Sequence, residues 1–293
     1  PEGLRDYQSL SQAGKTPRLT ICTGPHANMQ IFQHYLVLSK PWLDHQLKGK
    51  PLKFSKRPSR LTLGEKDVQF NILNTNEWFS ADRWPVPATP QKLYLTEDGL
   101  LAELPLRQSQ TNSAYTYDPM NPTPAIGGNM LEIQKPVVDN APLEKRSDTL
   151  VFTAQPFTET TYIIGEINVS IQFEANVETA DLFVRIYRID HKGKSTNGTD
   201  AIQRGFFSSK AGGCKRSDLA LIPTAVKFER GERLRLLIAS GAHPRVARNL
   251  GVGTTQEQAF MTEGKKAHVR VWHSAEYPSH IQLPIANQFV RSN

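Results

Sequence analysis

The feature that most constrains this chain is a series of short segments in which apolar and polar residues alternate strictly. Between residues 167 and 174 the apolar side chains are Ile167, Val169, Ile171 and Phe173, and a polar residue follows each of them. Successive side chains of a β-strand point to opposite faces, so this pattern predicts a strand with one buried face and one solvated face. Such half-buried strands are typical of antiparallel sheets.

Similar segments recur in the second part of the chain, at residues 182–189, 233–238, 268–272 and 281–283. The first of them ends in Asp190-His191-Lys192-Gly193, which favours a hairpin turn because glycine readily adopts a positive φ. Six or more short strands at regular spacing, without a notable helix, predict a β-sandwich or jelly roll over residues 95–293. The Pro-, Asn- and Ser-rich stretch 105–147 is predicted to be a long ordered loop on its surface.

Residues 1–94 have a different character, with alternating helix and strand signals. The pattern predicts a short helix over 4–10 that ends at Gly14, a buried strand over 18–23, helical segments over 29–38 and 42–47, and a strand over 67–73. Elements in this order are typical of a parallel α/β sheet. We therefore expect two units, an α/β segment over 1–94 and an all-β domain over 95–293.

Charge, apolar content and cysteine spacing exclude several classes of protein. The net charge is +7, but apart from a cluster at 48–60 the basic residues are scattered, whereas nucleic-acid binders concentrate charge on one face. The apolar runs fall far short of the roughly 20 residues of a membrane span. Cys22 and Cys214 match no metal-ligand spacing, so we expect buried thiols and neither a metal nor an organic cofactor. Nucleic acid and membrane are not expected partners, and a cytoplasmic location is the working assumption.

One histidine stands where catalytic residues are often found. His26 follows Gly24 and Pro25, between the predicted strand 18–23 and the helical segment after it. Ligands of open α/β sheets bind at the carboxyl ends of the strands, where a rigid strand fixes a general base and the loop exposes it. The alternative interpretation is a turn histidine beside a proline, and spacing alone leaves both interpretations open.

Other candidate residues have simpler interpretations. Ser195 lies within residues 193–198, the one match to G-x-S-x-x-G, but a hairpin does not expose a serine as a strand-to-helix turn does. His243 is interpreted as a packed loop residue. His268 and His273 flank Trp272 on a strand and have no partner at metal-ligand spacing.

Several phrases, in order, resemble the C-terminal half of the CocE/NonD serine hydrolases, the group that includes cocaine esterases, α-amino-acid ester hydrolases and X-Pro dipeptidyl-peptidases. They extend from about residue 4 to 285, and each alone is short. The quoted phrases are WLDHQLKG at 42–49, NTNEW at 74–78, YDP at 117–119 with GG at 127–128, RSDTLV at 146–151, GERLRL at 231–236, HPR at 243–245 with RN at 248–249, and PSHIQLP at 278–284.

This resemblance implies the last portion of an α/β-hydrolase domain over 1–94, followed by the family's jelly-roll domain, a galactose-binding-like β-sandwich, over 95–293. It also implies a Ser–Asp–His triad in that chain order. His26 matches the histidine, which would act as general base and then as general acid, while the serine and aspartate would lie upstream of Pro1. The implied substrates are small-molecule esters, amides or short peptides, X-Pro dipeptides included, and no cofactor is implied.

A histidine without its serine and carboxylate has no hydroxyl to activate, so the resemblance implies that this chain alone is inactive. A complementing N-terminal chain or a longer form of the protein would supply the missing groups, and assembly as a homo-oligomer stays open. An α/β segment without its other half would also leave a sheet edge and an apolar helix face uncovered. The alternative function is a non-catalytic jelly-roll module for binding or assembly, because fold alone does not decide function.

Overall fold

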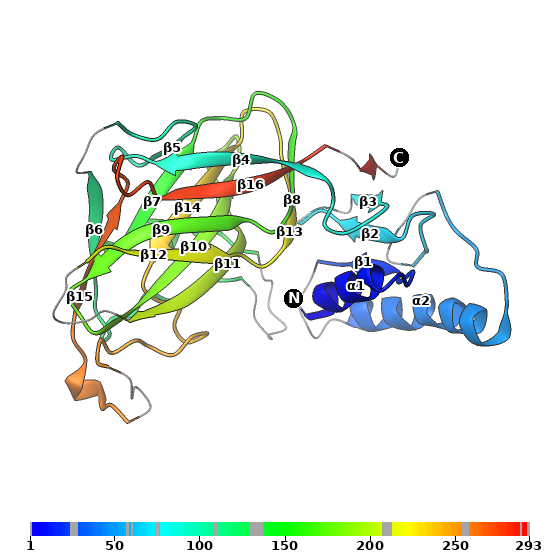
Figure 1. The fold of residues 1–293 in the computed structure, drawn as a ribbon, viewed down its shortest axis with the longest axis horizontal. Coiled ribbons are helices and arrows are strands. Elements are labelled where there is room, and N and C mark those ends of the chain that lie inside the picture. Colours follow the sequence, from blue (N-terminus) through cyan, green and yellow to red (C-terminus); the bar gives the residue numbers. More distant parts are fainter. Residues whose placement is uncertain are drawn as a thin grey trace.

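The computed structural model describes residues 2–23, 29–56, 59, 61–73, 75, 77–107, 111–128, 137–206, 213–253, 258–287 and 289–291. Within these residues the strands form one sheet of 13 strands and a separate sheet of four. Figure 1 shows the large sheet as a β-sandwich on one side of the molecule, with the small sheet and two helices on the other. The predicted β-sandwich is confirmed.

The small sheet combines the N-terminal segment with the end of the chain. Helix α1 (Glu2–Gln12) is followed by Gly14, whose φ of 73° ends the helix as predicted. Strand β1 (Leu19–Ile21) pairs in parallel with β2 (Val68–Asn71), whereas β3 (Trp78–Ala81) and β17 (Val290–Arg291) continue the sheet in antiparallel fashion. Helix α2 (Met29–Lys48) connects β1 to β2 and is a single helix containing Pro41, where the sequence predicted two segments.

The large sheet contains the alternating segments that the sequence predicted. Its main path runs β11-β10-β14-β7-β5-β4-β16-β9-β15-β6, with β12 on β9, and β8 on β13 and β16. A short helix α3 (Ala141–Glu144) and a 3₁₀ turn (Met261–Glu263) lie between strands. The strands are β4 (Ala88–Leu95), β5 (Leu100–Ala102), β6 (Asn112–Tyr117), β7 (Thr149–Ala154), β8 (Thr161–Gly165), β9 (Asn168–Ala175), β10 (Thr179–Ile189), β11 (Ser195–Phe206), β12 (Lys215–Ala220), β13 (Thr224–Phe228), β14 (Arg233–Ala239), β15 (Ala267–Trp272) and β16 (His280–Ala286).

Apolar residues from both layers form the core of the sandwich. Val169 and Phe173 of β9 belong to this core, as the alternation predicted. Strand β10 differs, because both of its faces are buried. Its other face carries Phe183 and Tyr187, which pack with Leu143 in a second cluster. A strand covered on both faces has no solvent-exposed face, so alternation alone could not identify its environment.

The stretch 105–147 is not one continuous loop, which corrects the prediction from composition. Strand β6 lies within it and pairs with β15, and α3 lies near its end. The strand signal was weak because only Tyr115 and Tyr117 of β6 are large and buried. The other residues of β6 are small or polar, so the composition of this segment resembles that of a loop.

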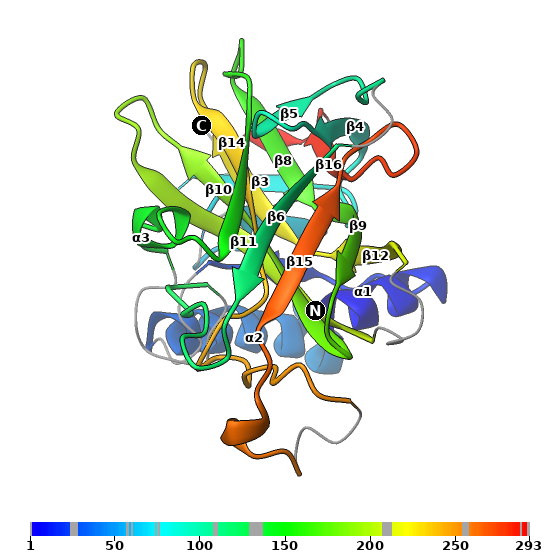
Figure 2. The same cartoon turned by 90° about the vertical axis from the view of Figure 1, so that its left-hand side faces the viewer.

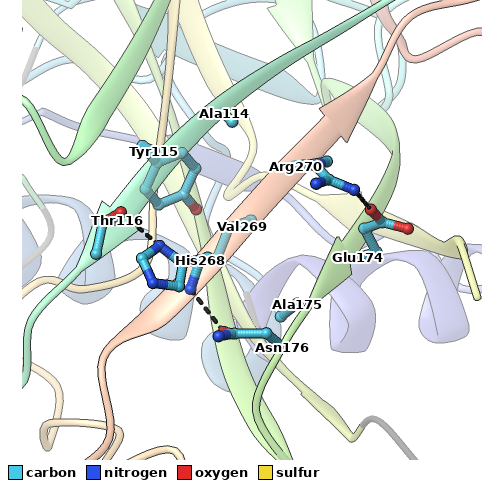
Figure 3. Close-up of a pocket in the computed structure, with 9 residues that line it drawn as sticks. All are labelled: Ala114, Tyr115, Thr116, Glu174, Ala175, Asn176, His268, Val269 and Arg270. Carbon is cyan, nitrogen blue, oxygen red and sulfur yellow. Dashed lines mark hydrogen bonds and ion pairs between the residues drawn. The ribbon is translucent and has the colours of Figure 1, made fainter. Parts of the chain in front are cut away.

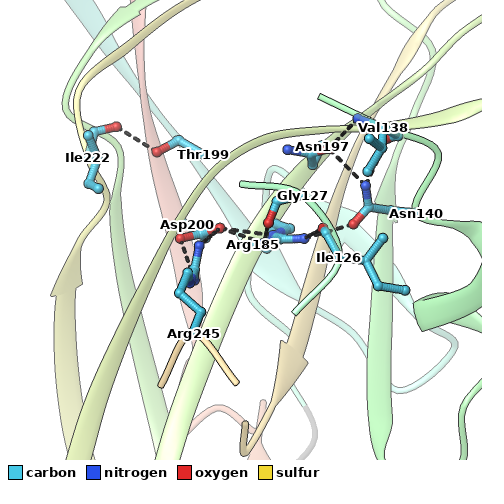
Figure 4. A network of polar contacts seen from close by, with 10 residues as sticks. All are labelled: Ile126, Gly127, Val138, Asn140, Arg185, Asn197, Thr199, Asp200, Ile222 and Arg245. Atoms are coloured by element: carbon cyan, nitrogen blue, oxygen red, sulfur yellow. Dashed lines mark hydrogen bonds and ion pairs between the residues drawn. The ribbon is translucent and has the colours of Figure 1, made fainter. Parts of the chain in front are cut away.

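A buried ionic network fastens this stretch to β10 and β11 (Figure 4). Arg185 on β10 pairs with Asp200 on β11, and its Nη1 donates to the carbonyl oxygen of Ile126 at 2.6 Å and to Asn140 Oδ1 at 2.8 Å. Gly128 approaches so closely that a Cβ atom there would lie 2.5 Å from Arg185 Nη2. Ile126, Gly127 and Asn140, which all belong to the stretch 105–147, are therefore held by Arg185.

The small sheet and the sandwich share a hydrophobic cluster. Phe70 and Phe79 of the small sheet belong to the same buried cluster as Ile164 of β8 and Ala225 of β13. Leu73, after β2, donates its amide to the Ala225 carbonyl oxygen at 2.8 Å. Figure 2 views the molecule from the end that is farther from the small sheet, the left-hand side of Figure 1. Strands β6 and β15 lie in front in this view, and α1 and α2 lie behind them. The junction with the small sheet and the β6–β15 surface thus lie at opposite ends of the sandwich.

Candidate functional site

The predicted catalytic histidine, His26, lies outside the described residues, in the segment 24–28. The elements on both sides of it are described. Strand β1 ends at Ile21 and helix α2 begins at Met29. The strand and the helix that were predicted to flank His26 are therefore present, and its catalytic role stays a prediction.

The carboxyl ends of β1 and β2 meet at one edge of the small sheet, because the two strands are parallel, with Ile21 opposite Phe70. Asn71 is buried at the end of β2, and its Oδ1 accepts a hydrogen bond from the Thr23 amide at 2.8 Å. Its Nδ2 donates to the carbonyl oxygen of Thr75 at 3.1 Å. The backbone is thus fixed at the edge where open α/β sheets bind ligands.

Glu77 comes after β2 in the chain, but its carboxylate already forms an ion pair. Glu77 donates its amide to Thr75 Oγ1 at 3.0 Å, and its Oε1 lies 3.1 Å from Lys227 Nζ on β13. Lys227 Nζ also lies 2.6 Å from Glu229 Oε1, and hydrogen bonding to Glu229 raises the pKa of Lys227 against the effect of partial burial. Sequence reasoning missed this pair, because partners 150 residues apart leave no local signal.

The other candidate residues have structural partners. Ser195 is buried in β11 and donates to Glu144, so the G-x-S-x-x-G match is coincidental. His243 is a loop residue whose Nε2 lies 3.4 Å from Arg248 Nη2. His273 is buried, and desolvation lowers its pKa. Within the described part of the chain, no group of His, Cys, Asp and Glu side chains could hold a metal ion.

The side of the small sheet beyond β1 is uncovered. Strand β1 is an edge strand, and no strand among the described residues pairs with its other side. A hollow of about 610 Å³ opens between β1 and α2, lined in part by Tyr35, Trp42 and the half-buried Cys22. Both predicted features, an open sheet edge and an exposed apolar helix face, are therefore present. Parallel sheets are normally covered on both faces. The exposed apolar residues of α2 are Phe32, Tyr35, Leu36, Val37, Leu43 and Leu47.

A second hollow, of about 580 Å³, lies on the outer face of β6, β15 and β9 (Figure 3). His268 Nδ1 lies 2.8 Å from Thr116 Oγ1 across the β15–β6 pair. Arg270 Nη1 donates to Glu174 Oε1 at 2.7 Å across the β15–β9 pair. These polar groups are already paired with one another. Strands β6 and β15, which line the hollow, lie at the end of the sandwich away from the small sheet (Figures 1 and 2).

Several known hydrolases have a similar sequence or fold. The family described as the X-Pro dipeptidyl-peptidase C-terminal non-catalytic domain matches residues 62–282. Cocaine esterase from Rhodococcus sp. (strain MB1 Bresler) is 24% identical over 272 aligned positions, and the alignment covers 86% of this chain and 46% of the esterase. A solved α-amino acid ester hydrolase has a TM-score of 0.80 at 21% identity, covering 95% of this chain and 52% of that chain. For a CocE/NonD family hydrolase from Staphylococcus aureus the TM-score is 0.64 at 15% identity, covering 96% and 51%.

These matches confirm the resemblance to the C-terminal half of CocE/NonD-type hydrolases. The chain spans about half the length of the relatives it matches. The likeness to the solved structures shows a common fold over nearly the whole chain. Among the described residues, no helix has the length and apolar character needed to cross a membrane.

Proposed function

The chain belongs to the family of X-Pro dipeptidyl-peptidase C-terminal non-catalytic domains, and we propose that it forms the C-terminal part of a serine hydrolase. The observation that carries the proposal is the uncovered side of the small sheet, where the open edge of β1 and the exposed apolar residues of α2 border one hollow. Large exposed apolar patches usually mark an interaction site. An N-terminal half that adds a strand to β1 and covers α2 would complete an α/β sheet.

In this proposal residues 1–94 are the last portion of an α/β-hydrolase domain, and residues 95–293 are the jelly-roll domain. The match to the non-catalytic family covers residues 62–282 and so leaves His26 outside it. The match begins within the 1–94 unit, before β2, and its exclusion of His26 supports a role for this residue in the part of the chain before residue 62. The sandwich would then shape the acyl pocket without supplying a reacting group.

His26 would serve an acyl-enzyme mechanism. It would take the proton of a serine hydroxyl as that oxygen attacks an ester or amide carbonyl, and then give the proton to the leaving group. The serine and the carboxylate that orients the imidazole would come from the N-terminal half. This chain alone would therefore be inactive, and the substrates would be small esters, amides or short peptides, X-Pro dipeptides included.

Labelling of the protein purified from its native source tests the proposal. A fluorophosphonate reacts with an activated serine, and intact mass reports the species that carries it. We expect one label on a species heavier than 32.9 kDa, or on a complex that contains this chain. A species of 32.9 kDa without label would contradict the proposal.

Substitution of the histidine tests its assignment within the labelled species. His26→Ala should abolish turnover while the protein stays folded. His45→Ala is the matched control, because this imidazole lies near the other end of α2, where its Nδ1 lies 2.7 Å from the Lys50 carbonyl oxygen and its ring centroid lies 6.3 Å from that of Trp42. Turnover at the wild-type rate in the His26 variant would refute the assignment.

A non-catalytic module for binding or assembly is the second candidate, because the family that matches residues 62–282 is described as a non-catalytic domain. A reading frame that begins near Pro1 and a chain that takes up no label would support this function. A reading frame that continues upstream into a strand followed by G-x-S-x-x-G would support the hydrolase instead.

A further inference from the structure

The end of the chain returns from the sandwich to the small sheet. Strand β16 of the sandwich ends at Ala286, and β17 then pairs in antiparallel fashion with β3 of the small sheet. Figure 1 shows the C-terminus beside β3, beyond the end of β16. Asn287 anchors the start of this connection, because its Nδ2 donates to Thr89 Oγ1 on β4 at 3.1 Å. One short segment at the end of the chain therefore contacts both sheets.

Phe289 lies in this segment and completes a triangle of three aromatic rings. Phe79 comes from β3 of the small sheet, and Tyr162 comes from β8 of the sandwich. The ring centroid of Phe289 lies 5.2 Å from that of Phe79 and 4.8 Å from that of Tyr162, and the other two centroids are 5.5 Å apart. All three pairs are edge-to-face, an arrangement that aromatic rings prefer. The triangle thus joins the small sheet, the sandwich and the end of the chain.

Other contacts across this junction come from the interior of the chain. The Leu73 amide donates to the Ala225 carbonyl oxygen at 2.8 Å, and Glu77 pairs with Lys227. Strand β17, in contrast, is the terminal strand of the small sheet, whose order is β1-β2-β3-β17. It can therefore separate from β3 while the pairing of β1, β2 and β3 stays intact. A strand of two residues at a sheet edge opens locally with ease, because few hydrogen bonds hold it.

We propose that Phe289 and β17 form a latch that fixes the small sheet on the sandwich. When the latch is closed, Phe289 packs on Phe79 and Tyr162 at once, so a displacement of one sheet against the other would break an aromatic contact. When the latch is open, the Leu73 hydrogen bond and the shared cluster hold the junction without this support, and the junction opens more often. The latch concerns the junction itself and does not depend on the proposed hydrolase function.

Amide hydrogen exchange in the purified 293-residue chain tests the latch, because single amides report separately on the junction and on the small sheet. In Phe289→Ala the Leu73 amide, which crosses the junction, should exchange about 10-fold faster, a change in the range expected from the loss of aromatic pairs. The Leu19 amide, which donates to the Asp67 carbonyl oxygen within the small sheet at 2.9 Å, should exchange at the wild-type rate. A chain that ends at Asn287 should give the same result.

Phe157→Ala is the matched control. Phe157 is also half-buried, and its ring centroid lies 4.8 Å from that of Phe228, but both rings belong to the sandwich. This variant should leave the Leu73 amide protected. Equal exchange of Leu73 in the two alanine variants would overturn the latch, and so would equal acceleration of Leu73 and Leu19, which would show that the whole small sheet had lost stability. Phe289→Ala decides the outcome if the shortened chain does not fold.

Discussion

The Asp200 carboxylate should be one of the most sensitive polar groups of the sandwich. Its Oδ2 lies 2.8 Å from Arg185 Nη2 and its Oδ1 lies 2.9 Å from Arg245 Nη2. The side chains of Arg185 and Asp200 are only 1% and 4% exposed, so solvent screens this interaction weakly. Asp200→Asn would leave two guanidinium groups facing each other with no carboxylate between them.

The expected cost follows from this burial. Removing one partner of a buried ion pair typically costs about 3–5 kcal/mol, because the remaining charge is desolvated and unpaired. With a urea slope of about 3 kcal/mol per molar, the unfolding midpoint of Asp200→Asn should fall by about 1 M or more. Faster amide exchange should accompany the loss at residues 126–128, since Arg185 also holds the carbonyl oxygens of Ile126 and Gly127.

Asp218→Asn provides the control for this experiment. Asp218 pairs with Arg216 at 2.9 Å, but the two side chains are 62% and 60% exposed. A pair in water contributes about 0–1 kcal/mol, so this variant should unfold within a few tenths molar of wild type. If Asp200→Asn cost no more than Asp218→Asn, the network in Figure 4 would not stabilise the fold and the reasoning would be refuted.

Three further predictions concern other parts of the chain. Gly128→Ala should lower the free energy of unfolding by about 1–3 kcal/mol, measured by urea titration, because φ is 96° there and the new methyl group would collide with Arg185. Burial lowers the pKa of His273, so the unfolded state binds its proton more readily; stability should fall as pH drops below about 6.5, and His273→Gln should flatten that pH profile. A pH profile equally steep in His273→Gln would contradict this origin. The exposed apolar residues of α2 should make the isolated chain self-associate, and replacing Phe32 and Leu47 by serine should reduce this association in sedimentation velocity. Unchanged association would show that α2 is not its cause.

Local features of the fold could be read from the sequence. The alternation in β9, the hairpin at Gly193 and the end of α1 at Gly14 all appear where they were predicted. Side-chain period and turn chemistry depend on neighbouring residues, so a short window of sequence contains the information. The order of quoted phrases likewise identified the family that the comparisons confirm.

Contacts between distant segments were decided only by the tertiary structure. Asn71 accepts from Thr23, 48 residues away, and Glu77 pairs with Lys227 over 150 residues. The covering of β10 on both faces likewise depends on a segment whose composition suggested a loop. The sequence does not show locally whether an asparagine or glutamate has a tertiary partner. Its role depends on the residue that folding places beside it. The sequence by itself therefore determined the alternating strands such as β9, the family and the candidate His26. The packed fold decided where the strands without alternation lie and which distant residues hold one another, because those contacts leave no local signal.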